Sequence, residues 1–291
     1  MKRIRRYGAV VLGVAAAASL AVGASGCGAA NTIDPVAKAA SISTTTPGFQ
    51  MRFVVRFGSP QLPTALTATG TGSINARSRT GSVLFVMNAG NDPDLKKAFG
   101  GSTLRFQELV NGTTVYLKLP AAIAAKLPGH RPWMKVDLAK ASGIPGFSSL
   151  ASNPVSSDPS QFLTYLRAAS GNVSKQGTAV VNGIQTTHYH ATISLDRVPN
   201  ALPAASRKGA KQAVSSIEQL TGLKQLPVDA WIDGSNLIRR MRLSFAESVA
   251  PSVKLNIAMT MDFLKYGPQP APTFPSADQV TDASSLSSLG G

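Results

Sequence analysis

Alternation of apolar and polar residues dominates the chain between residues 49 and 266. In the run 253–263, every odd-numbered position is apolar. In the run 49–57, Arg52 and Arg56 alternate with large apolar residues. A two-residue period places the apolar side chains on one face of an extended segment, so both runs predict half-buried β-strands.

Similar but weaker patterns extend this prediction over most of the chain. Further strands are expected at residues 66–76, 78–88, 103–110, 113–119, 173–181, 184–195 and 240–245. Asn111-Gly112 and Asn182-Gly183 predict tight type I′ hairpin turns, because both residues tolerate a positive φ. Asp233-Gly234 predicts a turn before the last two strands. Long antiparallel strands joined in hairpins should therefore dominate the fold.

Helices are expected to be fewer. Asp34-Pro35, Asp92-Pro93 and Asp158-Pro159 have the form of helix starts, since Asp caps free N–H groups and Pro suits the first helical position. An apolar stripe along residues 210–220 predicts a helix that ends near Gly222. These helices should pack on the apolar face of the sheet, which predicts an α+β half-barrel or open roll.

The N-terminus resembles a lipoprotein signal peptide. Four basic residues precede an apolar run at 10–22, and the small residues Ala24, Ser25 and Gly26 lead to Cys27. Cys27 is the only cysteine, so an intramolecular disulfide is excluded, whereas acylation needs one thiol. We predict covalent diacylglycerol on Cys27, with an N-acyl group as an optional addition and no other cofactor. An ordinary secretory signal or an uncleaved anchor helix is the alternative.

These features divide the chain into four predicted parts. Residues 1–26 form the signal peptide, 27–48 an acylated N-terminus with a linker and short helix, and 49–266 the folded domain. Residues 267–291, rich in Pro, Ser, Ala and Gly, are expected to be a disordered tail. The expected location is the cell membrane, with the lipid-anchored chain on its extracytoplasmic face.

Charge narrows the choice of partners. The formal net charge is +15, and removing the four basic residues of the signal peptide leaves +11. An exported chain has little access to nucleic acid, so anionic lipid headgroups or acidic envelope polymers are the expected counterparts. The alternative is that the charge only keeps the protein soluble.

Residues that would carry catalysis or bind metal do not converge in the sequence. His188 and His190 would share one face of a strand, but a metal site needs at least one more ligand, so no metal is expected. Gly70-Thr71-Gly72 lacks the Lys and the following helix of a phosphate-binding loop. Three acidic residues are scattered among strands: Asp229, Asp233 and Asp262. A binding protein is therefore predicted rather than an enzyme, and no catalytic residue is assigned.

Three segments resemble actinobacterial LppX/LprG-type lipoproteins. They are DPSQFLTYLRAASGNVSKQGTAVVNG (158–183), NGIQTTHYHATISL (182–195) and LPVDAWIDGSNLIRRMRL (226–243), which follow one another in the order found in that family. The resemblance implies a LolA-like open half-barrel, with helices on the concave face of a curved antiparallel sheet. It also implies a cavity for a lipid or lipoglycan, lined by inward-facing residues: Val55, Phe85, Leu117, Leu243, Met259 and Met261.

Two functional hypotheses follow from these observations. The first is a membrane-anchored lipoprotein that binds a lipid or glycolipid in an apolar cavity and moves it through the cell envelope, with an envelope transporter or acceptor protein as partner. The second is an envelope sensing module, or one that binds a protein or polymer, in which the same half-barrel has a filled core.

Overall fold

The described part of the computed structural model comprises residues 34–58, 66–88, 96–97, 101–125, 128–137, 166, 170–201, 204–250 and 253–284. The chain divides into two units, Met1–Thr32 and Ile33–Gly291, and every described residue belongs to the second. This second unit contains its own hydrophobic core, as expected of a part that folds by itself. None of its described helices has the length and apolar character needed to cross a bilayer.

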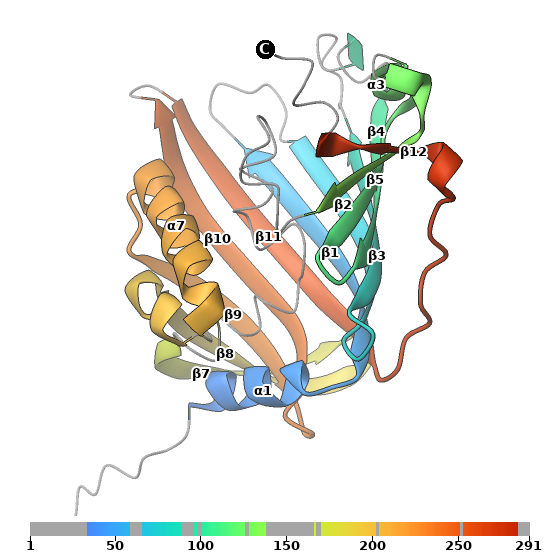
Figure 1. The fold of residues 1–291 in the computed structure, drawn as a ribbon. Coiled ribbons are helices and arrows are strands. Elements are labelled where there is room, and N and C mark those ends of the chain that lie inside the picture. Colours follow the sequence, from blue (N-terminus) through green and yellow to red (C-terminus); the bar gives the residue numbers. More distant parts are fainter. Residues whose placement is uncertain are drawn as a thin grey trace, which may run out of the picture. The chain divides into compact units, whose positions relative to one another are not determined.

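One mixed sheet of twelve strands forms the second unit (Figure 1). Its strand order is β12-β6-β5-β4-β3-β2-β1-β11-β10-β9-β8-β7, and the two end strands are not paired with each other. All described neighbours are antiparallel except β12, which runs parallel to β6. The strands are β1 (Gly48–Gly58), β2 (Leu66–Asn75), β3 (Thr80–Asn88), β4 (Thr103–Asn111), β5 (Thr114–Lys118), β6 (Trp133–Asp137), β7 (Ser170–Val181), β8 (Ile184–Ser194), β9 (Gln225–Asp233), β10 (Ile238–Ala250), β11 (Val253–Tyr266) and β12 (Val280–Asp282).

The described helices that cover the sheet lie on one face of it. Helix α7 (Ala204–Thr221) packs against β10, and α1 (Pro35–Thr44) packs against β7, β9 and β10 (Figure 1). Five shorter helices connect the other elements: α3 (Ala121–Ala124), η1 (Pro128–His130), η3 (Leu195–Arg197), η4 (Pro199–Ala201) and η5 (Ala277–Gln279). The predicted α+β open half-barrel is confirmed, with the correction that one edge strand is parallel.

Two predicted helix boundaries are confirmed by their capping geometry. Asp34 Oδ1 accepts hydrogen bonds from the backbone N–H groups of Val36, at 2.8 Å, and Ala37, at 3.1 Å. At the end of α7, Gly222 adopts a φ of +66°, and its N–H donates to the carbonyl of Glu218. The expected helix starts at Asp92-Pro93 and Asp158-Pro159 lie outside the described residues.

The hairpin turns differ in how well the sequence predicts them. Asn182 and Gly183, with φ of 50° and 83°, form the predicted type I′ turn between β7 and β8. The prediction of the same turn at Asn111-Gly112 is wrong, because Asn111 still pairs with Thr114. Gly112, at φ 60°, is the first of two loop residues, a position that glycine occupies in type II′ turns.

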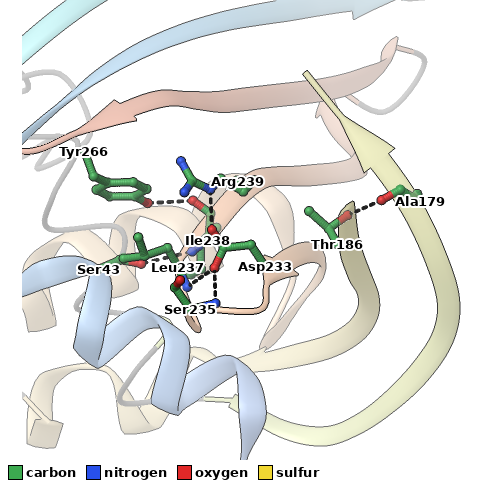
Figure 2. A network of polar contacts seen from close by, with 9 residues as sticks. All are labelled: Ser43, Ala179, Thr186, Asp233, Ser235, Leu237, Ile238, Arg239 and Tyr266. Atoms are coloured by element: carbon green, nitrogen blue, oxygen red, sulfur yellow. Dashed lines mark hydrogen bonds and ion pairs between the residues drawn. The ribbon is translucent and has the colours of Figure 1, made fainter. Parts of the chain in front are cut away.

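The turn after Asp233 is longer than the dipeptide Asp233-Gly234 predicts. Asp233 Oδ1 accepts hydrogen bonds from the N–H groups of Ser235 and Leu237, and Asn236 has the positive φ (Figure 2). The Asp233 carboxylate therefore stabilises a longer loop, because it accepts hydrogen bonds from backbone N–H groups within that loop. Its second oxygen forms an ion pair with Arg239 at 2.6 Å.

The same loop is linked to α1 and β11. Ser43, at the end of α1, accepts a hydrogen bond on Oγ from the N–H of Ile238, and the hydroxyl of Tyr266 donates to the carbonyl of Ile238 (Figure 2). Burial, the largest effect, raises the pKa of Tyr266, which keeps the phenol in its neutral, donating form. Both backbone polar groups of Ile238, a fully buried residue, are thus satisfied.

The prediction of a disordered tail is wrong for residues 267–284. This segment runs along the outer face of the sheet, where the Phe274 ring packs 5.5 Å from that of Tyr116. Val280–Asp282 then forms β12 beside β6, and Asp282 pairs with Lys135 at 2.8 Å. Arg131 donates to the carbonyl of Val280 at 2.6 Å. Specific contacts thus order a segment whose composition resembles that of a linker.

Gly70 has a packing role rather than a phosphate-binding one. It pairs with Phe53 across β1 and β2, and the Phe53 ring covers the place where a Cβ would stand. A Cβ added at Gly70 would lie 2.0 Å from Cζ of that ring. The ring is buried and packs 4.9 Å from the ring of Phe85, so it has little room to move.

Replacing Gly70 should therefore overpack the inner face. We expect Gly70→Ala to destabilise the Ile33–Gly291 unit by about 1–3 kcal/mol in urea unfolding. Gly58→Ala is the matched control, because nothing lies within 4 Å of a Cβ added there. The control should leave stability unchanged or slightly raised, and equal stability of the two variants would contradict the proposed packing role.

Candidate functional site

The strand registers bring apolar side chains from neighbouring strands onto one face of the sheet, here called the inner face. Phe53 pairs with Met261 and Gly70, and Phe85 pairs with Phe106, so the inward positions line up from β11 across to β4. The buried faces of α1 and α7 join the same core cluster. The inner face is therefore the apolar side predicted from the alternation, and the helices pack on it as expected.

Burial divides the inner face into two zones. A packed zone adjoins α1 and α7 and is almost fully buried; it includes Phe49, Met51, Phe53, Ile74, Met241, Leu243, Met261 and Phe263. A second zone, here called the open patch, consists of inward apolar residues that remain partly accessible. Its members are Val55, Phe57, Leu66, Phe85, Met87, Leu104, Phe106, Leu117, Phe245, Ile257 and Met259.

The open patch is continuous across the sheet. Phe57 pairs with Ile257 on one side and with Leu66 on the other, and Ile257 also pairs with Phe245. Contiguous accessible apolar surface of this kind is uncommon on soluble proteins and marks binding sites. The residues of the open patch keep part of their surface accessible, while those of the packed zone are buried.

All six residues predicted to line a cavity lie on the inner face. Four of them, Val55, Phe85, Leu117 and Met259, belong to the open patch. The other two, Leu243 and Met261, are 4% exposed and belong to the packed zone. Contact of any of these residues with a ligand remains a prediction, and Cys27 lies outside the described residues.

Glu108 is a site residue that the sequence reasoning missed. It occupies an inward position on β4, where it pairs with Val83 of β3 and Leu117 of β5. Its exposure is 5%, and burial raises the pKa of its carboxyl to about 7. The alternation could have identified Glu108 as an inward acidic residue, since the other inward residues of this strand are apolar: Leu104, Phe106 and Val110.

The outer face carries ion pairs between neighbouring strands. Asp262 on β11 receives Nε and Nη2 of Arg240 at 2.5 and 2.9 Å, and Nη2 of Arg52 at 3.0 Å. Burial alone would raise the pKa of Asp262, but the hydrogen bonds from Arg240 and Arg52 outweigh it and hold that pKa below its ordinary value. These contacts link β10, β11 and β1 across the outer face.

The two strand histidines belong to the same outer face. His188 Nε2 and His190 Nδ1 each lie 3.1 Å from Oδ1 of Asp229, and the His188 ring stacks 4.2 Å from that of Trp231. Asp229 is thus paired, although the sequence shows it as isolated. No group of three or more His, Cys, Asp or Glu residues suited to a metal ion occurs within the described ranges.

Two clusters of basic residues occur on α7 and at the start of β10. Arg207, Lys208 and Lys211 on α7 are exposed. Arg239 and Arg240 are committed to ion pairs with carboxylates on neighbouring structure. These side chains form a charged surface and do not converge on one point.

A pocket of about 340 Å³ lies between the outer face and the C-terminal segment. Its lining consists of Ser73, Ser82, Gln107, Leu109, Pro270, Ala271, Pro272 and Thr273. The buried Oγ of Ser73 has no hydrogen-bond partner among the described residues. The pocket is on the opposite side of the sheet from the open patch and is more polar, so it does not suit an acyl chain.

The fold and the open patch define an open half-barrel with an accessible apolar inner face. The chain is similar to an uncharacterised 31.2 kDa protein of the rplA–rplJ intergenic region of Streptomyces griseus, with 26% identity over 264 residues, 88% of this chain and 82% of the relative. No family model matches the chain.

Similar solved structures include two mycobacterial lipoproteins. LprF of Mycobacterium bovis and LppX of Mycobacterium tuberculosis each give a TM-score of 0.40 at 16% identity, over 82% of this chain and 94% and 98% of theirs. A LolA superfamily protein of Nitrosomonas europaea gives 0.32 at 7% identity, over 82% and 93%. LppX is one of the lipoproteins that the three sequence segments resemble.

Burial of Glu108 should make stability depend on pH. Below pH 4.5 the carboxyl is protonated in both folded and unfolded chains, and between pH 4.5 and about 7 only the unfolded chain loses the proton. The free energy of unfolding should therefore fall as pH rises through this window, by about 3 kcal/mol in total. Urea unfolding of the Ile33–Gly291 unit and its Glu108→Gln variant at pH 4.5 and 7.5 measures the change.

In that comparison, Glu108→Gln should gain stability over wild type as pH rises, because the amide does not ionise. Asp196→Asn is the control, since Asp196 is exposed and its substitution should leave the pH profile as in wild type. A constant difference between wild type and Glu108→Gln at both pH values would contradict the effect of burial.

Proposed function

We propose that this chain is a lipid-anchored protein of the cell membrane, on the extracytoplasmic face, that binds a lipid or glycolipid on the inner face of its half-barrel and carries it through the envelope. The observation that supports this proposal is the open patch. It offers a continuous apolar surface, next to a packed zone that keeps the sheet folded when the ligand leaves.

The chemistry of the open patch suits acyl chains. Burying apolar surface stabilises a complex by about 25 cal/mol per Å², with no requirement for direction. Aromatic and aliphatic side chains provide this surface, and Met87 and Met259 add flexible thioethers that adapt to chains of different shape. An apolar wall with few fixed contacts favours a carrier of lipids over a site for one small polar metabolite.

The proposed anchor fits this ligand. Acyl chains on Cys27 would hold the domain at the membrane surface, where its lipid ligand is found, because each buried CH₂ contributes about 0.8 kcal/mol. The basic charge would favour a surface of anionic lipids. An envelope transporter or acceptor protein is the proposed partner in transfer.

Native mass spectrometry with organic extraction tests the binding function. We expect the Ile33–Gly291 unit, expressed in its native host, to carry a stoichiometric lipid. The Met259→Trp variant should lose most of this lipid, because the indole fills the open patch, while its stability in urea should change little. A protein that is empty and also rejects added lipids would contradict the proposal and favour a sensing or polymer-binding module.

Met261→Trp is the matched control for this variant. Met261 lies two residues further along β11 and faces the same way, but it is buried in the packed zone. Its replacement should cost about 1–3 kcal/mol of stability through overpacking. Equal destabilisation by the two substitutions would mean that the inner face is filled throughout.

Acylation is tested by Cys27→Ala in the full chain. Without the thiol, the protein should leave the membrane fraction or remain unprocessed, because the proposed signal requires that cysteine. Cell fractionation and intact mass measurement would report both effects. Processing and membrane partition like those of wild type would overturn the lipoprotein assignment.

A further inference from the structure

The surroundings of Glu108 are apolar on every described neighbouring strand. The inward residues are Val83 and Phe85 on β3, Val115 and Leu117 on β5, Phe106 and Val110 on β4, and Met134 and Val136 on β6. None of these residues is titratable. The nearby cations Arg105 and Lys118 occupy alternate positions, which face outward.

The carboxyl has no compensating contact within the described part of the chain. No hydrogen bond or ion pair among those residues reaches Glu108, although its exposure is 5%. Burial is the cause of its shifted pKa, with no contribution from a charged neighbour. An acidic side chain among apolar neighbours is unfavourable once it ionises, and a functional role would explain its position.

Glu108 also lies at the boundary between open and packed regions. Leu117, its partner on β5, and Phe106, two positions along β4, belong to the open patch. Val83, its partner on β3, is 4% exposed and belongs to the core cluster. A ligand that covers the open patch would therefore meet this carboxyl at the edge of the patch.

We propose that Glu108 is a polar subsite of the inner face that binds a hydroxyl group of the lipid ligand. This inference rests on the proposed lipid-binding function. A protonated carboxyl both donates and accepts a hydrogen bond, and so does a hydroxyl, so the two groups satisfy each other without placing a charge in an apolar site. A phosphate or carboxylate would bring its own charge into an apolar site at a desolvation cost, and an ammonium group would require a buried ion pair with its own desolvation cost.

The hydroxyl can belong to the headgroup or to the acyl chain, and three probes distinguish these sources. They are dioleoylglycerol, with a headgroup hydroxyl; dioleoyl-acetylglycerol, with none; and diricinoleoyl-acetylglycerol, with hydroxyls on the chains. Each is presented in phosphatidylcholine vesicles to the Ile33–Gly291 unit at pH 6, and the protein-bound fraction is measured after the vesicles are removed.

We expect wild type to bind one of the two hydroxylated probes about tenfold more tightly than the probe without a hydroxyl. Glu108→Leu should bind all three probes equally and still take up the acetylated diacylglycerol, which shows that it is folded and competent. Glu108→Gln should retain much of the preference, since an amide also donates and accepts. The exposed-site variant Asp196→Asn should behave as wild type.

The outcomes separate the two proposals. Equal binding of all three probes by wild type, or an unchanged preference in Glu108→Leu, would overturn the subsite and leave lipid binding intact. A wild-type protein that takes up none of the probes and carries no lipid of its own would overturn both.

Discussion

The apolar inner face of an open sheet is the constraint on which the rest of this structure depends. A sheet that closes on itself buries its inner side chains against one another, but here the end strands β7 and β12 do not meet. Other elements must therefore cover the apolar face. Helices α1 and α7 do so over β7, β9 and β10 and complete the packed zone. The partly accessible residues of the open patch mark where that cover is incomplete.

The outer face does not need the same cover, since its polar residues face solvent or one another. Asp262 illustrates how this is achieved, because two guanidinium groups from neighbouring strands converge on one carboxylate. Two residues that point outward, Trp133 and Leu109, are buried, whereas the outward Leu84 and Leu264 remain exposed. The C-terminal segment lies beside Trp133 and Leu109, through β12 and through the pocket lining. The segment is therefore part of the folded domain.

Much of the fold could be predicted because a two-residue period determines which face a side chain occupies. The strands over residues 49–57 and 253–263 pair as that pattern requires, and all six candidate lining residues point inward. The pattern cannot give depth of burial, which depends on the helices packed above. Leu243 and Met259 are paired neighbours on the same face, yet one lies in the packed zone and the other in the open patch. That difference decides which of these apolar residues keep accessible surface.

The remaining misses have identifiable physical causes. The composition of residues 267–284 predicted disorder, but this proline-rich segment is held by ring packing and by an ion pair. The partners in both contacts are residues far away in sequence. Asp229 gave no local signal for a similar reason, since its histidine partners come from the adjacent strand. Turn lengths were missed where one residue, such as Asn111, continued the strand pairing. Interactions distant in sequence are invisible to spacing arguments.

Glu108 shows how the same constraint links stability to binding. An acidic residue at an inward position weakens the folded domain once the pH approaches its raised pKa of about 7. An apolar residue at that position would avoid this cost. A ligand that excludes water from the carboxyl raises its pKa further, unless the ligand supplies a hydrogen bond to the ionised form. By linkage, protonation of Glu108 and uptake of a neutral lipid that donates no hydrogen bond to the ionised carboxyl favour each other. Glu108, which lowers the stability of the ligand-free domain, can thus contribute to the selection of the ligand.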